Sequence, residues 1–569
     1  MGGRALRTLF VVSFLVGLTT WAPAQSFRVQ CPTSTVTHPD QANSGVNNTE
    51  PAYTGATTYT AGANGYLVPN SGTVNGAIKC QQISGGDGYA TMADGTQTFM
   101  FSFGPLSGLA DIATGKAGTE FPKTFNSVYS GTLLPGDPAT TDGASDNDGT
   151  SGVYASGIPG AFAYNGAVGL TPDLDRIGDG VCTTPCLDGH VDPHQIMDIG
   201  VMNGNIPAPL MAFDEDDEFF LTLTNVGMIM RPDLFEQHTV HFHGYPNASS
   251  FYDGVPDASV AINIGGSFTY YYLAPDAGTY FWHCHITPPE HLQMGMVGQL
   301  YVRPRQNRVP AGTSLYTALQ QQNGLGATVD LRTACNPAAD ILCSASMPAI
   351  NTGKTQGSDK LGNPQKYTYN DGDGLTAYDV EYPLQIHGFD PNFHFVGMTF
   401  NPEAFADMKD KYFLLNGRSY PDTVTPGPMA TQSSDGRMHY SQPLPSVINI
   451  PAGGKALLRI ADLDVTEYQT LASLGIKMHV IGFNAKLLRD QAGNNMDYYT
   501  NSITLGGGES LDVILDASNT TLYPAGSVFY LFTPQLDHLT NDAENFGGLM
   551  TEVHVCNSVS GSTFGNTCN

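Results

Sequence analysis

Hydrophobic and polar residues alternate along several segments of this chain, which is the pattern of half-buried β-strands. The alternation is clear over residues 98–103, 219–225, 237–243 and 279–285, and strand-like sequence resumes near residue 378. Clusters of Gly, Pro, Ser and Asn separate these segments and predict turns rather than long helices. The pattern therefore predicts an all-β protein.

Two of the predicted strands carry metal-ligating residues on both faces. Successive side chains of a strand point to opposite faces, so residues two apart share a face. The same-face pairs are His241 with His243 and His283 with His285, and the residues facing the other way are His238 and Cys284. If the two strands are neighbours, four imidazoles meet on one side of the sheet and a thiol meets an imidazole on the other.

The segment after Cys284 predicts a return of the chain to the same sulfur. Prolines at 288–289 cannot continue a strand ladder and predict a loop. Such a loop can bring His291 and a methionine back to Cys284, and two His, one Cys and a weak axial Met form the ligand set of blue-copper sites. Met296 is the predicted axial ligand, with Met294 as the alternative. Zinc on the same histidines is the competing interpretation, but it leaves the Cys-His-Met segment unexplained.

Composition sets the size and the class of protein. The chain has 569 residues, which is enough for two or three domains. With 52 acidic and 24 basic residues, its formal net charge is −28. Such a surface disfavours binding to nucleic acid or anionic lipid and favours a cationic partner. We expect the acidic run 214–218 to be a solvated entrance to a strand.

Residues 1–24 have the pattern of a secretory signal peptide. Arg4 and Arg7 precede a mostly apolar stretch, and Ala22-Pro23-Ala24 is typical of a cleavage site. A membrane anchor retained at 9–22 is the alternative. We therefore expect a secreted or extracytoplasmic protein, either periplasmic or extracellular.

Nine cysteines are present, and the even number left after setting Cys284 aside suggests disulfides in an exported chain. Sequence proximity predicts the pairs Cys182–Cys186, Cys335–Cys343, Cys556–Cys568 and Cys31–Cys80. Two groups of aspartates have spacings compatible with calcium, although solvated turns are the alternative and neither group matches an EF-hand. These groups are Asp173, Asp175 and Asp179, and Asp371, Asp373 and Asp379.

The segment from Met202 to Pro304 resembles a cupredoxin (plastocyanin-like) domain of the multicopper oxidase and copper nitrite reductase superfamily. The matching pieces are 202–207, His241-Phe242-His243-Gly244, 252–255, 278–283 and 296–302. The resemblance implies type 1 copper on His238, Cys284, His291 and Met296. It also implies a type 2/type 3 copper centre on His241, His243, His283 and His285. Asp253 lies where such enzymes often carry a proton-relay carboxylate.

A second domain resembles the same superfamily but lacks most of its copper ligands. Segment 477–482 falls against 240–244 and retains only His479, while 530–535 falls against 281–285 and retains no ligand. His538 survives nearby without partners. Segment 382–388 superficially resembles the third-domain histidine motif of laccases, and we interpret His387 and His394 as structural.

The resemblance implies two cupredoxin-like Greek-key β-sandwich domains. The expected organisation is a signal peptide at 1–24, a loop-rich segment at 25–85, a copper-binding domain at 86–305 with an insertion at about 104–195, a linker at 306–377, and the second domain at 378–569.

Three functions follow from the resemblance. In the first, a multicopper-oxidase-like enzyme takes electrons from a small-molecule or metal-ion reductant and passes them through Cys284 to His283 and His285, where oxygen is reduced. The second is a nitrite-reductase-like enzyme with type 2 copper on His243 and His283, and the third is a blue-copper carrier. A trinuclear centre in this family takes eight histidines and this chain shows four, so a homo-oligomer is one way to supply the rest.

Overall fold

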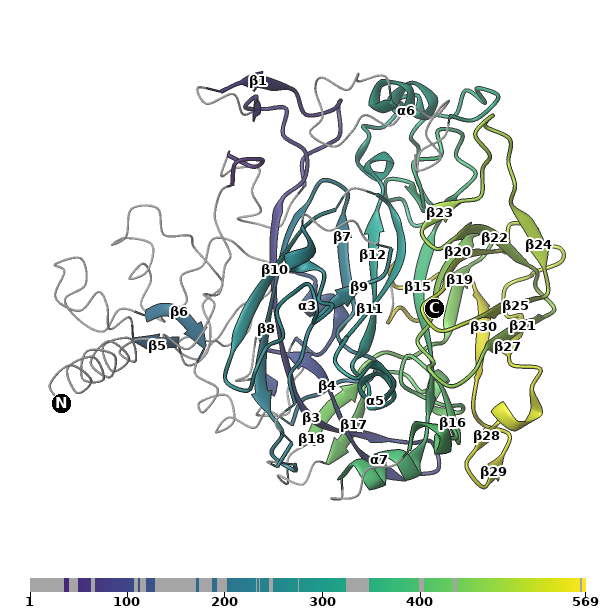
Figure 1. Ribbon diagram of the computed structural model, residues 1–569. Helices are drawn as coiled ribbons and strands as arrows, with labels where there is room; N and C mark the ends of the chain where they lie inside the picture. Colours follow the sequence, from purple (N-terminus) through teal and green to yellow (C-terminus); the bar gives the residue numbers. More distant parts are fainter. Residues whose placement is uncertain are drawn as a thin grey trace, which may run out of the picture.

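Two β-sandwich domains lie side by side in the computed structural model (Figure 1). The structure describes residues 35–39, 50–62, 67–106, 111–112, 119–127, 170–172, 187–191 and 202–569. Within the last range it omits 232, 235, 245–248, 275, 324–346, 399–403, 433–435, 437 and 563–564. The prediction of an all-β fold is confirmed.

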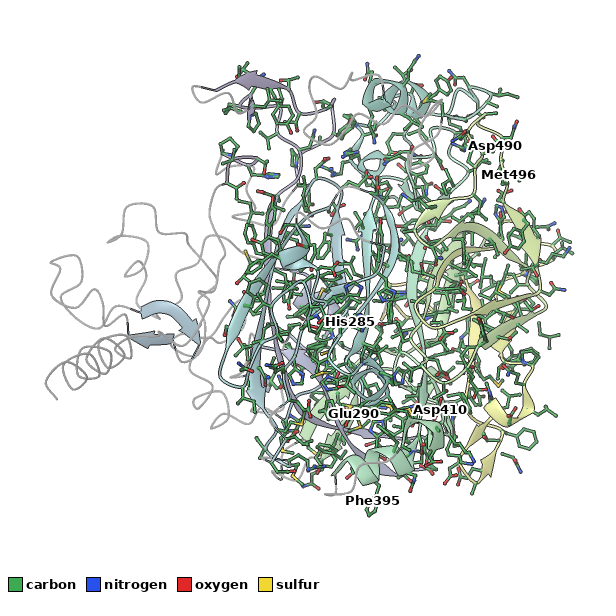
Figure 2. The ribbon with its side chains drawn as sticks, in the orientation of Figure 1. His285, Glu290, Phe395, Asp410, Asp490 and Met496 are labelled. Carbon is green, nitrogen blue, oxygen red and sulfur yellow. A yellow bond between two sulfur atoms is a disulfide. The ribbon has the colours of Figure 1, made fainter. Side chains whose placement is uncertain are left out.

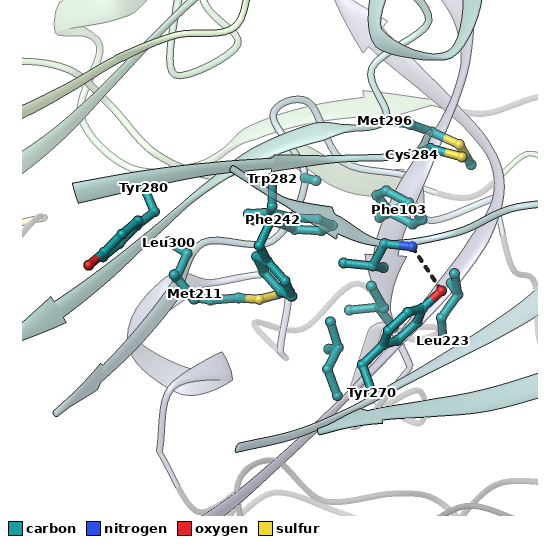
Figure 3. Packing of buried hydrophobic residues seen from close by; sticks show 14 of the residues in the cluster. Phe103, Met211, Leu223, Phe242, Tyr270, Tyr280, Trp282, Cys284, Met296 and Leu300 are labelled. Carbon is teal, nitrogen blue, oxygen red and sulfur yellow. Dashed lines mark hydrogen bonds between the residues drawn. The ribbon is translucent and has the colours of Figure 1, made fainter. Parts of the chain in front are cut away.

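The first domain packs two four-stranded sheets against each other. One sheet has the strand order β10-β8-β3-β4, with bounds Ser267–Leu273, Glu218–Gly227, Ile78–Thr91 and Gln97–Pro105. The other has the order β7-β12-β11-β9, with bounds Met211–Asp214, Val297–Arg303, Gly278–His283 and His241–Phe242. Aromatic and aliphatic side chains from both sheets, among them Phe103, Leu223, Phe242 and Trp282, fill the space between them (Figure 3). Burial of each such side chain stabilises the fold by roughly 1.5–3 kcal/mol.

The second domain is built in the same way from larger sheets. Its main sheet runs β23-β22-β26-β20-β15-β16-β28-β29, with bounds Lys486–Leu487, Met478–Phe483, Ser510–Asp516, Lys455–Asp462, Val380–Phe389, Tyr412–Leu415, Thr540–Asn541 and Glu544–Asn545; β24 (Tyr498–Thr500) pairs with β22. The opposing sheet runs β19-β30-β27-β21-β25, with bounds Ile448–Pro451, Met550–Cys556, Val528–Phe532, Gln469–Leu474 and Ser502–Leu505. Alternate aliphatic residues of both sheets form a continuous buried core.

Smaller elements surround the two sandwiches. Two-stranded pairs are β1–β2 (Tyr59–Ala61, Leu67–Pro69), β5–β6 (Leu170–Pro172, Leu187–Val191), β13–β14 (Lys366–Tyr367, Ala377–Tyr378) and β17–β18 (Met429–Gln432, Met438–Gln442). The α-helices in the described residues are α3 (Pro122–Phe125), α5 (Pro288–Gln293), α6 (Leu315–Asn323) and α7 (Pro391–Met398). In the described part of the chain, no helix has both the length and the hydropathy needed to cross a membrane.

The segment after Cys284 is helical, so the predicted loop at 288–289 is wrong. Pro288 and Pro289 occupy the first positions of α5. A proline is well tolerated in the first turn of a helix, because the N–H that it lacks would have no partner within the helix. The strand before it is also shorter than predicted, since β11 ends at His283.

The acidic run 214–218 is buried, which contradicts the prediction of a solvated strand entrance. Its carboxylates are paired with cations from distant parts of the chain. Lys79 Nζ lies 2.8 Å from Asp217, and Arg305 Nε lies 2.6 Å from Asp216. The first sheet also starts earlier than the predicted boundary at residue 86, because β3 begins at Ile78.

Disulfides agree with the predictions where the structure describes them. Cys556 is bonded to Cys568, as predicted. Cys80 is disulfide-bonded too, while Cys31 and the pairs Cys182–Cys186 and Cys335–Cys343 lie outside the described residues. Cys284 is a free, buried thiol, in agreement with its proposed role as a ligand.

Candidate metal centre

Strand register brings the two histidine-rich segments together. β11 pairs with β9 in the antiparallel sense, with His283 opposite His241 and Trp282 opposite Phe242. His238 lies just before β9 and forms an isolated bridge with Ile262. The predicted neighbourhood of the two segments is therefore confirmed, although β9 itself is limited to two residues.

Two buried imidazoles converge on the sulfur of Cys284. His291 Nδ1 lies 3.3 Å from Cys284 Sγ, and His238 Nδ1 lies 4.0 Å from it. All three residues are fully buried, and their ligand atoms lie within 4.8 Å of one another. We call these residues together with Met296 the sulfur site.

Backbone hydrogen bonds fold the segment from Cys284 to Met296 back on itself. Met296 N donates to His291 O at 2.8 Å, and Cys284 N donates to Met296 O at 3.0 Å. The side chains of Met296 and Cys284 end close together (Figure 3). Met294, the alternative axial residue, is also buried. Met296 lies beside the cysteine, and its choice over Met294 as the axial ligand stays a prediction.

The electrostatics of the two sulfur-site imidazoles differ. Burial and the neighbouring His291 hold the pKa of His238 well below its usual value, which keeps its imidazole neutral. Burial also opposes protonation of His291, but the Cys284 sulfur and the Glu236 carboxylate raise its pKa to about 9. Metal binding at His291 would therefore release a proton, because a ligand nitrogen must be deprotonated to bind metal.

Four imidazoles form a second cluster on the other side of β9 and β11. His241 is central, with ring centroids 5.1 Å from His243, 5.4 Å from His283 and 5.1 Å from His285. His285 is labelled in Figure 2. Gly508 of the second domain lies close to this cluster. A Cβ atom placed on it would be only 3.1 Å from His243 Nδ1, so there is little space for a side chain. We call these four histidines the histidine site.

Hydrogen bonds fix which nitrogens of the histidine site are free to bind metal. His283 Nδ1 lies 2.6 Å from Cys284 O, and His241 Nδ1 lies 2.6 Å from Asp253 O. Since a carbonyl oxygen only accepts, each Nδ1 carries the proton and each Nε2 carries a lone pair, as in many metal-bound histidines.

Burial keeps two imidazoles of this cluster, His243 and His283, neutral. Burial and the nearby His241 and His285 lower the pKa of His243 to about 4. Burial and His243 hold the pKa of His283 well below its usual value. His243 Nε2 lies 2.9 Å from His283 Nε2, and since the proton of His283 is on Nδ1, the neutral His243 ring donates this hydrogen bond to His283 Nε2.

Asp253, the predicted proton relay, is in contact with the histidine site. Its carboxylate Oδ2 lies 3.6 Å from His241 Nδ1, in addition to the hydrogen bond that its carbonyl accepts. The predicted site residues are thus brought together in two groups, with Asp253 at the edge of one of them.

Two further residues at these sites were missed by the sequence reasoning. Thr239 N donates to Cys284 Sγ at 3.4 Å, and its hydroxyl accepts a hydrogen bond from His285 N at 2.9 Å. Glu236 Oε2 lies 3.6 Å from His291 Nε2. Both residues lie within two positions of His238 in the sequence, and this proximity to a predicted ligand could have indicated them.

The calcium prediction is not supported. Asp371 accepts hydrogen bonds from Gly374 N and Thr376 N, Asp373 is paired with Arg489, and Asp379 accepts from the backbone N–H groups of Lys360 and Lys455. These carboxylates therefore already bind backbone N–H groups or an arginine of the protein. The other predicted group, Asp173, Asp175 and Asp179, lies outside the described residues.

Copper fits both groups by donor chemistry. A buried thiol, two imidazoles and a thioether are soft and borderline ligands, which suit copper and do not suit magnesium or calcium. The histidine site offers lone-pair nitrogens that are already oriented by hydrogen bonds to backbone carbonyls.

A family model described as multicopper oxidase matches residues 188–307, a range that contains both sites. This segment belongs to the multicopper oxidase superfamily. Over 112 residues, the multicopper oxidase segment is 35% identical to multicopper oxidase MCE of Talaromyces pinophilus, which covers 19% of this chain and 17% of that protein. Over 107 residues it is 36% identical to laccase-1 of Emericella nidulans, which covers 18% of this chain and 15% of that protein. The chain therefore matches only a small part of these relatives.

Solved structures resemble this chain at a lower level of sequence identity. Blue copper oxidase from Nitrosomonas europaea aligns with a TM-score of 0.40 and 20% identity, covering 62% of this chain and 78% of that chain. A crystal structure of a multicopper oxidase aligns with a TM-score of 0.40 and 12% identity, covering 90% and 98%.

Proposed function

We propose that the protein is a secreted, multicopper-oxidase-like copper oxidoreductase. It takes single electrons from a reducing substrate at the sulfur site and reduces oxygen at the histidine site. The observation that carries the proposal is the convergence of His238, Cys284 and His291 on one side of a strand pair whose other side holds four imidazoles. The similarity to fungal laccases supports the same reaction class.

The chain itself links the two sites. When bound, copper would supply one-electron chemistry at the sulfur site and oxygen reduction at the histidine site. Cys284 and His283 are consecutive residues, and the hydrogen bond from His283 Nδ1 to Cys284 O shortens the path between the thiol and the imidazole. Asp253 is placed to exchange protons beside His241, and burial keeps water away from the sulfur.

Copper content and oxygen consumption test the proposal. An oxidase requires about four coppers per chain, a nitrite-reductase-like enzyme about two, and a blue-copper carrier about one. His285→Ala should leave the thiolate-to-copper absorption band intact and reduce oxygen consumption by roughly 100-fold, because it removes a ligand of the histidine site only.

His554→Ala is the matched control, since His554 is a half-buried histidine of the second domain that pairs with Glu552. Its oxygen consumption should equal that of the wild type. Nitrite-dependent turnover without oxygen consumption, or unchanged oxygen consumption in His285→Ala, would contradict the proposal.

Glu236 is expected to attract cationic reductants to the edge of the sulfur site. Its carboxylate is partly exposed and lies beside His291 Nε2. Replacing it by Gln should raise KM for a cationic reductant about fivefold, since a partly exposed charge contributes ~1 kcal/mol. Steady-state kinetics with a cationic and an uncharged reductant measure this difference, and an equal change for both would show that the charge is not the cause.

A further inference from the structure

The second domain holds the helix that carries His291. His387 of β15 and His394 of α7 contact the end of α5, and the side chain of Leu292 packs in an apolar cluster with Ala461 and Leu463. This contact places a domain without a copper set of its own against the segment that joins Cys284 to Met296.

Polar groups of the second domain bind the last turn of α5 directly. His387 Nε2 donates to Leu292 O at 2.9 Å, and His394 Nε2 lies 2.9 Å from Gln293 O. The Gln293 side chain donates to Asp410 Oδ1 at 2.8 Å and accepts from Asp390 N at 3.3 Å. Figure 2 shows Glu290 of α5 and Asp410 of the second domain at the same end of the molecule.

These contacts are buried and lie between domains. His387, His394 and Gln293 are at most 2% exposed. His394 also reaches the first sheet, because its Nδ1 lies 2.7 Å from Phe99 O, and its ring stacks on Phe389 with centroids 3.6 Å apart. Burial lowers the pKa of His394 to about 3, so the neutral ring has one N–H and donates to one of the two carbonyls at a time. Hydrogen bonds in such a dry environment are costly to break, so they fix the position of the backbone that they bind.

We propose that His387, His394 and Gln293 are positioning residues for the sulfur site, so that the second domain determines how His291 and Met296 approach Cys284. This inference rests on the proposed function. The backbone chain of bonds is continuous: α5 is held at Leu292 and Gln293, Met296 N binds His291 O, and Cys284 N binds Met296 O. Displacement of α5 would therefore change the geometry of every ligand in that segment.

His479 shows that a buried histidine of this domain need not serve this purpose. Its Nε2 lies 2.7 Å from Asp497 and its ring stacks on Tyr499, all within the second domain. It is a suitable control, because its replacement disturbs the same domain without touching α5.

The first test compares His387→Leu, which removes the donor to Leu292 O, with His387→Gln, which retains a side-chain N–H donor. In the copper-loaded protein, H387L should shift the thiolate-to-copper absorption band and the reduction potential. H387Q should restore both toward the wild type. His479→Leu should lower the thermal midpoint and leave the band and the potential unchanged. A wild-type band and potential in H387L would overturn the inference.

The second test uses the metal-free protein and does not depend on copper. The rate at which a thiol reagent modifies Cys284 should rise roughly tenfold in H387L, the effect of losing one buried hydrogen bond. It should be unchanged in His479→Leu. Unchanged thiol reactivity in H387L would likewise overturn the inference.

A third variant guards against misfolding of H387L. Gln293→Met keeps the length of the side chain, and methionine is also a good helix former. The substitution removes the side-chain hydrogen bonds to Asp410 and Asp390. It should show the same change in thiol reactivity and band position, and wild-type behaviour would count against the inference. Absence of the absorption band in wild-type protein would defeat the proposed function, while the thiol-reactivity arm would still decide whether the second domain holds α5.

Discussion

Cys284→Ser is expected to abolish the intense thiolate-to-copper absorption of the copper-loaded protein and to lower its copper content by one per chain. Serine keeps the size of the side chain but replaces the soft sulfur donor by a hydroxyl, which is a poor ligand for copper. The two imidazoles at 3.3 Å and 4.0 Å from the sulfur would then lack their central partner. Absorption spectroscopy and metal analysis of the purified variant measure both effects.

The variant should remain folded, because Cys284 is a free thiol and forms no disulfide. Its circular dichroism should match the wild type, and its thermal midpoint without metal should change by only a few degrees. Cys556→Ser is the matched control, because it breaks the disulfide with Cys568 and leaves the sulfur site intact. An absorption band retained in Cys284→Ser would show that the sulfur is not a ligand.

The site could be predicted largely because strand periodicity is local. Residues two apart share a face whatever the rest of the fold does, so His241 with His243 and His283 with His285 could be grouped from sequence. The meeting of the four imidazoles on one side of the sheet then follows from one assumption, that the strands are neighbours, and the pairing of β9 with β11 confirms that assumption.

Features that depend on distant partners could not be predicted in this way. The acidic run 214–218 has the composition of a solvated strand entrance. Lys79 and Arg305 approach it from other parts of the chain, and their charges offset the cost of burying its carboxylates. The helix α5 was missed because prolines both end strands and begin helices, and only the surrounding fold decides between these roles.

The contacts of the second domain with the sulfur site also depend on distant partners and could not be predicted from the sequence. Sequence indicated that His387 and His394 are structural, and both are indeed buried and hydrogen-bonded. It gave no sign that their partners are the carbonyls of Leu292 and Gln293, because that contact joins segments about a hundred residues apart. Long-range contacts of this kind decide how a domain without copper ligands can affect a copper site.

Glu381→Gln is expected to destabilise the protein by ~3 kcal/mol near neutral pH, because it leaves buried cations without their counter-charge. Glu381 is fully buried on β15, where it lies 3.1 Å from Arg303 of the first domain and 3.2 Å from Arg459 of the second. These two cations outweigh the effect of burial and lower the pKa of Glu381 to about 2. Urea denaturation at pH 7 measures the loss in unfolding free energy.

The pH dependence of this loss follows from the sign of the shift. A carboxylate with a depressed pKa contributes stability that is fully present above its unfolded value, near 4.3, and is lost as pH falls toward its folded value. The difference in unfolding free energy between wild type and Glu381→Gln should therefore narrow from about pH 5 down to about pH 2.

Lys455→Gln is the matched control, because Lys455 lies on the same strand as Arg459, β20, and forms a partly exposed pair with Asp516 at 3.0 Å. Its replacement should cost less than ~1 kcal/mol, as is usual for surface pairs. A similar cost for both variants, or a cost for Glu381→Gln that does not change with pH, would show that the ion pairs between the domains contribute little. A large cost that falls with pH would identify Glu381 as the charge that holds β12, β15 and β20 together, and with them the two domains.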